Sequence, residues 1–205
     1  MSIAESIAQI LLKEKAVFLR PDEPFTWTSG IKSPVYCDNR LLISTVESRD
    51  LVIKAFAEAV HKLKVDVIAG TATAGIPWAA WIAYELKLPM IYVRSTSKDH
   101  GRQNAIEGAA MPGKTAVLIE DLISTGKSSI AASKKVEEAG MKVESVMSIF
   151  TYDFPQAQDI FQANGLKYLS LSNFEVLAKV AYDNKMLNEQ ALNQVLEWRK
   201  SVVFP

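Results

Sequence analysis

The sequence predicts an α/β fold in which a central parallel sheet is flanked by helices. Short apolar runs alternate with helix-like segments from residue 65 onward, a pattern typical of parallel strands joined by crossover helices. The chain has 205 residues, of which 49% are hydrophobic, enough to bury a sizeable core. We find no internal repeat and no linker that would demand a second large domain. We therefore expect one domain over residues 1–205, with an N-terminal part at 1–40, an α/β core at 41–171 and C-terminal helices at 172–205.

The N-terminal part is expected to begin with a helix and to continue as an irregular segment. Apolar residues at helical spacing predict a helix over residues 2–16. Residues 20–39 contain prolines and a glycine that break regular structure, so we expect an irregular segment that ends in a short strand. Residues 46–63 are again expected to be helical.

The core is predicted from alternating apolar and amphipathic segments. Strands are expected at 65–69, 89–93, 115–120, 143–150 and 167–171, and helices at 75–87, 126–139 and 156–164. Gly140 follows the second of these helices as a normal C-terminal glycine. The remainder, from Ser172 on, is expected to be helical.

Composition excludes several classes of protein. Lys plus Arg and Asp plus Glu are 23 each, which argues against a general nucleic-acid binder. Cys37 is the only cysteine, so an internal disulfide cannot form, and a reducing cytoplasm fits best. The N-terminus does not resemble a signal peptide, and the longest apolar stretch, at 76–88, is too short to span a bilayer. We expect a cytoplasmic protein that binds neither nucleic acid nor membrane.

The most informative segment is residues 117–129, where an apolar strand leads to Glu120 and Asp121 and then to a Ser-Thr-Gly turn. Ligands of open α/β sheets bind at the carboxyl ends of strands, and a helix N-terminus binds anions. A sugar phosphate suits both features, because its phosphate fits the turn and its hydroxyls suit the carboxylates. The alternative is that these residues merely cap the next helix. A nucleotide P-loop is excluded, because it requires glycine where Asp121 stands.

Three further segments carry polar or small residues where ligands could bind. Residues 25–38 combine aromatic, hydroxyl and glycine residues that suit a flat polar ligand, or form an ordinary surface loop. Small residues at 69–77 suit either a bound anion or tight packing of strand on helix. Residues 94–113 form a long segment with cations at its start, which is typical of a functional loop. Tyr152 could contribute to a site or be packed in the core.

Residues 120–126, Glu-Asp-Leu-Ile-Ser-Thr-Gly, resemble the phosphoribosyl diphosphate signature of the type I phosphoribosyltransferases, and the Leu-Ile-Ser-Thr-Gly part is similar to the orotate-specific branch. The other segments match the same branch in order, so the resemblance covers essentially the whole chain. It implies a Rossmann-like core with a small N-terminal hood, which includes residues 25–38 and closes over the base. It also implies binding of the ribose phosphate and diphosphate by these residues: Glu120, Asp121, Leu122, Ile123, Ser124, Thr125, Gly126, Lys127, Ser128, Thr73 and Ala74.

The resemblance further implies the reaction and its other groups. Ribose 5-phosphate would pass from phosphoribosyl diphosphate to orotate, whose carboxylate Lys32 could face. Arg94, Lys98 and His100 would stabilise the leaving diphosphate across a homodimer whose subunits share active sites, and Asp121 would act at the ribose. Mg²⁺ would be held mainly by the substrate, and no protein nucleophile is required. The rival interpretations are a transferase for another base and a regulatory protein that senses phosphoribosyl diphosphate and binds nucleic acid.

Overall fold

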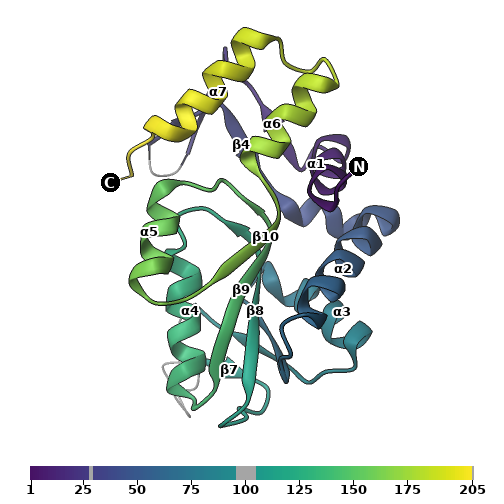
Figure 1. Cartoon of the computed structure of the whole chain (residues 1–205), viewed down its shortest axis with the longest axis vertical. Coiled ribbons are helices and arrows are strands. Elements are labelled where there is room, and N and C mark those ends of the chain that lie inside the picture. Colours follow the sequence, from purple (N-terminus) through teal and green to yellow (C-terminus); the bar gives the residue numbers. More distant parts are fainter. Residues whose placement is uncertain (28–29, 96–104, 205) are drawn as a thin grey trace.

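The computed structural model describes residues 1–27, 30–95 and 105–204, and over these residues its centre is a six-stranded sheet (Figure 1). The strands follow the order β10-β9-β8-β5-β6-β7, and every neighbouring pair is parallel except β6 with the edge strand β7. Their bounds are β5 Val67–Thr71, β6 Met90–Val93, β7 Ile106–Glu107, β8 Thr115–Ile123, β9 Lys142–Thr151 and β10 Tyr168–Asn173. The predicted fold class is therefore confirmed.

Helices cover both faces of the sheet (Figure 1). Helices α2 (Val46–His61) and α3 (Gly75–Leu86) lie on one face, and α4 (Lys127–Glu138) and α5 (Pro155–Ala163) lie on the other. A third group sits beyond one end of the sheet and consists of α1 (Ile3–Lys13), α6 (Phe174–Asp183) and α7 (Glu189–Ser201). Helix α1 packs against α6 and β10, so the N-terminal part of the chain packs there against residues 168–183.

Successive side chains along the strands pack into two hydrophobic clusters, one on each face of the sheet. Ile68 and Ile119 belong to the hydrophobic cluster shared with α2 and α3. Ala69 and Leu118, one residue away, belong to the cluster shared with α4 and α5. Because successive strand residues point to opposite faces, nearly continuous apolar runs are what a doubly covered parallel sheet requires.

The hood is a small antiparallel layer. Strand β1 (Val17–Leu19) pairs with β4 (Val35–Cys37), and β2 (Phe25–Thr26) pairs with β3 (Lys32–Ser33), before the 3-10 helix η1 (Asn39–Ser44). The sequence predicted only an irregular segment that ends in a short strand. Strands of two or three residues are too short to show periodicity, which is why β1, β2 and β3 were not predicted.

The main error in the predicted boundaries concerns β8. It was expected to end at Glu120, but it continues to Ile123 because Leu122 and Ile123 still pair with Phe150 and Thr151 of β9. The acidic pair therefore lies within the strand. Strand β5 is also displaced, from the predicted 65–69 to Val67–Thr71, and β7 lies in a segment that was expected to be a loop.

The sheet has a topological switch point between β5 and β8. The chain passes from β5 to β6 on one side and returns to β8 on the other, so the loops after β5 and β8 diverge. Ligands of open α/β sheets bind in this crevice. Two glycines allow the close packing that forms it, because a Cβ at Gly75 would overlap the main-chain oxygen of Ile119 and one at Gly70 would lie 2.8 Å from Ala79 Cβ.

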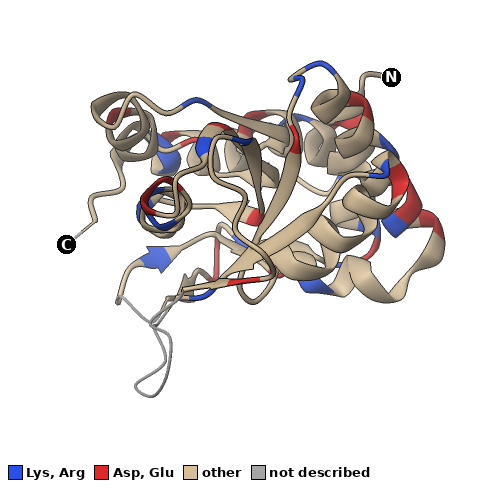
Figure 2. Ribbon diagram, turned by 90° about the horizontal axis from the view of Figure 1, so that it is seen from below, with Lys and Arg blue, Asp and Glu red and all other residues tan. Residues whose placement is uncertain are grey.

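Charge is distributed over the whole molecule. Figure 2 shows basic and acidic positions interspersed along the described ribbon, as expected from equal numbers of the two. None of the helices in the described part of the chain is both long and apolar enough to cross a membrane.

Candidate active site

Glu120 and Asp121 occupy different surroundings at the carboxyl end of β8. Glu120 is 6% exposed, and its Oε1 accepts a hydrogen bond from Ser129 Oγ of α4 at 3.0 Å. Asp121 is partly buried beside the hood, where its main-chain oxygen accepts a hydrogen bond from Asn39 Nδ2 at 2.7 Å. Adjacent strand residues point to opposite faces, so a ligand that contacts both carboxylates must lie across the strand end.

Burial makes both carboxyl groups weaker acids than usual. It raises the pKa of Glu120 to about 7, with a smaller contribution from Asp121, while hydrogen bonds from Ser129 and Ser128 oppose the shift. Burial also raises the pKa of Asp121, against main-chain hydrogen bonds and the positive charge of Arg40. Additional hydrogen-bond donors would stabilise the ionised form of both carboxyl groups, and the hydroxyls of a ribose are suitable donors.

The turn after β8 leads to a helix N-terminus that remains available to an anion. Gly126 is the N-cap residue of α4, has φ +80°, and supplies no side-chain cap. Neither Ser124 nor Thr125 caps the helix, so the capping interpretation of these residues is wrong. A Cβ on Gly126 would lie 2.8 Å from a ring carbon of Phe161, which adds a steric reason for glycine here. Lys127 and Ser128 are exposed on the first turn.

The loop after β5 places a second helix N-terminus beside the first. Helix α3 begins after Ala74 and also has no side-chain cap, while Thr73 is exposed and Ala74 is partly exposed. Thr71 Oγ1 is buried without a hydrogen bond of ordinary geometry to any described residue, although it is near enough to Glu120 to lower that pKa. The small residues therefore serve packing at Gly70 and Gly75 and leave the main chain accessible at residues 73 and 74.

A cavity of about 420 Å³ separates the hood from the end of the sheet. Its lining is mostly apolar and aromatic and consists of Phe25, Thr26, Trp27, Tyr36, Cys37, Leu122, Ser124 and Tyr152. Ser124 thus borders both this cavity and the turn at the start of α4. Lys32 is exposed near the rim, and its Nζ donates a hydrogen bond of 2.6 Å to Thr26 Oγ1. We name this space the base cavity, because its size and flat aromatic walls suit a heterocyclic ring.

Tyr152 is both packed in the core and part of the cavity wall, which are the two positions that the sequence left open. The residue is 4% exposed, and its ring centroid lies 5.4 Å from that of Trp27 and 5.1 Å from that of Phe154. It is also part of the cavity wall. Burial raises its phenol pKa well above the usual range, so the hydroxyl is neutral.

A polar link between hood and strand was missed from the sequence. Cys37 Sγ lies 3.1 Å from Asn39 Oδ1, and Asn39 is 1% exposed while it holds the main chain of Asp121. Asp38 and Arg40 form a forked ion pair with distances of 2.6 and 2.9 Å. Burial raises the pKa of the Cys37 thiol well above its usual value, which disfavours the thiolate that a nucleophile needs. The run Asp38-Asn39-Arg40 after an apolar strand was the available signal.

Of the three predicted cations after β6, only Arg94 can be located, because Lys98 and His100 lie outside the described residues. Arg94 Nη1 is 3.4 Å from Glu107 Oε1, and its main-chain N–H donates to Ala105 O at 2.8 Å. Lys135 of α4 donates to the main-chain oxygens of Arg94 and Ser95, both at 2.8 Å. These contacts join the two ends of the loop to the sheet and to α4.

A parallel sheet with carboxylates, two uncapped helix N-termini and a ring-sized cavity at its switch point defines a nucleotide-forming or nucleotide-binding site. Residues 44–183 match the phosphoribosyl transferase domain family. The chain is 47% identical over 203 residues to an orotate phosphoribosyltransferase of Listeria monocytogenes, covering 98% of this chain and 97% of that protein. The chain therefore belongs to the orotate phosphoribosyltransferase family.

Solved structures agree with this assignment. An orotate phosphoribosyltransferase from Aeropyrum pernix superposes with a TM-score of 0.76 at 27% identity, covering 89% of this chain and 99% of that one. The UMP synthase of Leishmania donovani superposes with a TM-score of 0.82 at 28% identity over 96% of this chain, which spans 42% of the length of that protein.

Proposed function

We propose that this protein transfers ribose 5-phosphate from phosphoribosyl diphosphate to orotate, giving orotidine 5′-monophosphate and diphosphate for pyrimidine synthesis in the cytoplasm. Family membership over nearly the whole chain supports the reaction class and the base. The position of Ser124 is the observation that carries the proposal, because this residue borders both the base cavity and the turn that suits a phosphate. A base and a ribose phosphate bound there would be adjacent, as their joining requires.

The donor substrate would lie across the switch point. Its 5-phosphate would accept hydrogen bonds from the main chain at residues 124–128, where α4 begins without a side-chain cap. Its ribose hydroxyls would contact Glu120 and Asp121, and its diphosphate would meet the main chain at Thr73 and Ala74. Leu122 and Ile123 would support the turn through their pairing with β9.

Orotate would occupy the base cavity between the hood and Tyr152. Its flat ring suits the aromatic walls, and Lys32 and Ser124 are the nearest polar groups with which to recognise its carboxylate and carbonyl oxygens. A ring nitrogen of orotate would attack C1 of the ribose as the bond from C1 to the diphosphate oxygen breaks. The mechanism needs no covalent enzyme intermediate, so positioning and charge stabilisation supply the catalysis.

The leaving diphosphate would be stabilised by Lys98 and His100 of a partner subunit. Arg94, whose Nη1 lies 3.4 Å from Glu107 Oε1, has further N–H donors with which it would join them. Mg²⁺ bound to the diphosphate would neutralise part of its charge. The described residues contain no group of three or more His, Cys, Asp or Glu side chains able to hold a metal.

The direct test is the loss of orotate absorbance after phosphoribosyl diphosphate and Mg²⁺ are added. We expect turnover with orotate and none with uracil, adenine, guanine or hypoxanthine at the same concentrations. Asp121→Asn should weaken use of phosphoribosyl diphosphate, whereas Asp159→Asn, at an exposed position of α5, should not. Preference for another base would instead favour a related transferase, and salt-sensitive nucleic-acid binding without turnover would favour a regulatory protein.

A further inference from the structure

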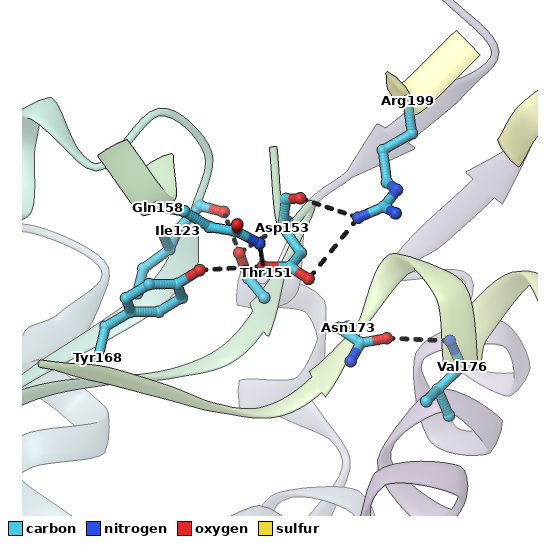
Figure 3. A network of polar contacts seen from close by, with 8 residues as sticks. All are labelled: Ile123, Thr151, Asp153, Gln158, Tyr168, Asn173, Val176 and Arg199. Atoms are coloured by element: carbon cyan, nitrogen blue, oxygen red, sulfur yellow. Dashed lines mark hydrogen bonds and ion pairs between the residues drawn. The ribbon is translucent and has the colours of Figure 1, made fainter. Parts of the chain in front are cut away.

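The turn that follows β9 is held by a polar network centred on Asp153 (Figure 3). Asp153 has φ +53°, in the left-handed region that residues other than glycine seldom adopt. Its main-chain N–H donates to Thr151 Oγ1 at 2.9 Å, and Thr151 Oγ1 donates to Ile123 O at 3.1 Å. The turn is therefore tied to the last residue of β8, directly before Ser124.

The side chain of Asp153 is fixed from three further elements, β10, α5 and α7. Its Oδ1 accepts hydrogen bonds from Tyr168 Oη at 2.9 Å and from Gln158 Nε2 at 3.1 Å. From α7, Arg199 Nη1 donates to the main-chain oxygen of Asp153 at 2.8 Å and lies 3.6 Å from its Oδ2 (Figure 3). The Arg199 side chain is 15% exposed and that of Asp153 is 32% exposed, so these charge-assisted contacts are partly shielded from water.

Helix α7 also contacts the hood, which forms another part of the wall of the base cavity. Trp198 Nε1 donates to the main-chain oxygen of Lys32 at 2.9 Å, and its ring meets that of Trp27 edge-on with centroids 5.8 Å apart. Gln194 Nε2 donates to Pro21 O at 3.0 Å. One helix, outside the switch point, therefore contacts both the hood and the turn that carries Tyr152.

We propose that Arg199 is a positioning residue for the base. It does not line the base cavity, but it holds the main chain at Asp153, so that the neighbouring Tyr152 keeps its place against Trp27 in the cavity wall. This inference rests on the proposed function. The contacts proposed for phosphoribosyl diphosphate lie on the loops after β5 and β8, and Arg199 is linked to the second of these only indirectly, through Asp153 and Thr151. Loss of Arg199 should therefore weaken orotate binding more than binding of phosphoribosyl diphosphate.

The test compares Arg199→Met with Lys200→Met, a matched loss of one positive charge at the next, exposed position of the same helix. We expect Arg199→Met to raise KM for orotate about five- to tenfold, with KM for phosphoribosyl diphosphate and kcat changed less than about twofold. Lys200→Met should leave all three within about twofold. Arg199→Lys retains a donor for the Asp153 oxygen and should restore KM for orotate to within about threefold.

Tyr168→Phe provides a second approach from another element, because it removes a different hydrogen bond to Asp153. We expect KM for orotate to rise about two- to fourfold, again without a matching change for phosphoribosyl diphosphate. If Arg199→Met fails to fold, Arg199→Lys and Tyr168→Phe decide the question by the same comparison. Unchanged values, or equal rises for both substrates, would overturn the inference. A wild-type protein without orotate turnover would instead overturn the proposed function.

Discussion

Replacing Glu120 by glutamine should have opposite effects on stability and on activity. Glu120 is 6% exposed, and burial raises its pKa from the usual 4.5 to about 7. The folded chain therefore binds this proton more tightly than the unfolded chain. The resulting stabilisation is fully present below pH 4.5 and is lost as the pH rises through 7.

The size of both effects follows from this pKa. A shift from 4.5 to about 7 corresponds to at most about 3 kcal/mol of unfolding free energy. The wild type loses this contribution at pH 8, where Glu120 is ionised, whereas the glutamine variant is neutral at every pH and does not lose it. For activity, the contact that we propose between Glu120 and the ribose hydroxyls requires the ionised carboxylate. The ionised fraction rises about tenfold between pH 6 and pH 8 for a pKa of about 7, so kcat/KM for phosphoribosyl diphosphate should rise by a similar factor.

Two measurements test this reasoning on the same proteins. Urea unfolding at pH 5 and pH 8 should show that the stability gained by Glu120→Gln over wild type is larger at pH 8 than at pH 5, by roughly 1–3 kcal/mol. The ratio of wild-type to variant kcat/KM should rise about tenfold over pH 6–8, since titration of the substrate itself cancels in the ratio. Glu58→Gln, at an exposed position of α2, should show neither effect. A stability difference that is the same at pH 5 and pH 8, or a ratio that does not change with pH, would refute the assignment.

Three further outcomes are expected. Lys98→Ala should lower kcat far more than it raises the KM of either substrate. A change in KM as large as the change in kcat would contradict a role in the transition state. Asn39→Ala should lower the unfolding free energy by about 1–3 kcal/mol in urea, because it leaves the main-chain oxygen of Asp121 without its 2.7 Å hydrogen bond; an unchanged midpoint would count against this link. Gly75→Ala should destabilise by about 1–3 kcal/mol or prevent folding, since its Cβ overlaps Ile119 O, and a melting temperature equal to wild type would disprove the close packing.

The fold could be predicted from the sequence because its strands are buried on both faces. The run of β8 is apolar over most of its length, and the segments that form the neighbouring helices show regular spacing. The end of β8 was misplaced because Glu120 and Asp121 look like a strand end, whereas their pairing with β9 continues. Strand β7 was missed because two residues give no periodicity.

The candidate site could be proposed from the sequence where one continuous motif carries it, at residues 120–128. Contacts between residues that are distant in the sequence were missed. The contact of Asn39 with Asp121 spans 82 positions, and that of Arg199 with Asp153 spans 46, so neither pair can be recognised from local spacing. Helix α7 brings Arg199 to Asp153 from the C-terminal part of the chain.

The aromatic cluster at the base cavity gives the protein an optical property. Of its four tryptophans, Trp27 lines the cavity, and the ring of Trp198 contacts the ring of Trp27 edge-on. Trp78 and Trp81 contact each other on α3. A ring that enters the cavity would change the surroundings of the first pair and leave the second pair as they are. Intrinsic fluorescence should therefore respond to occupation of the cavity, and replacement of Trp27 by phenylalanine should remove most of that response. Occupancy could then be followed in the unlabelled protein, separately from turnover.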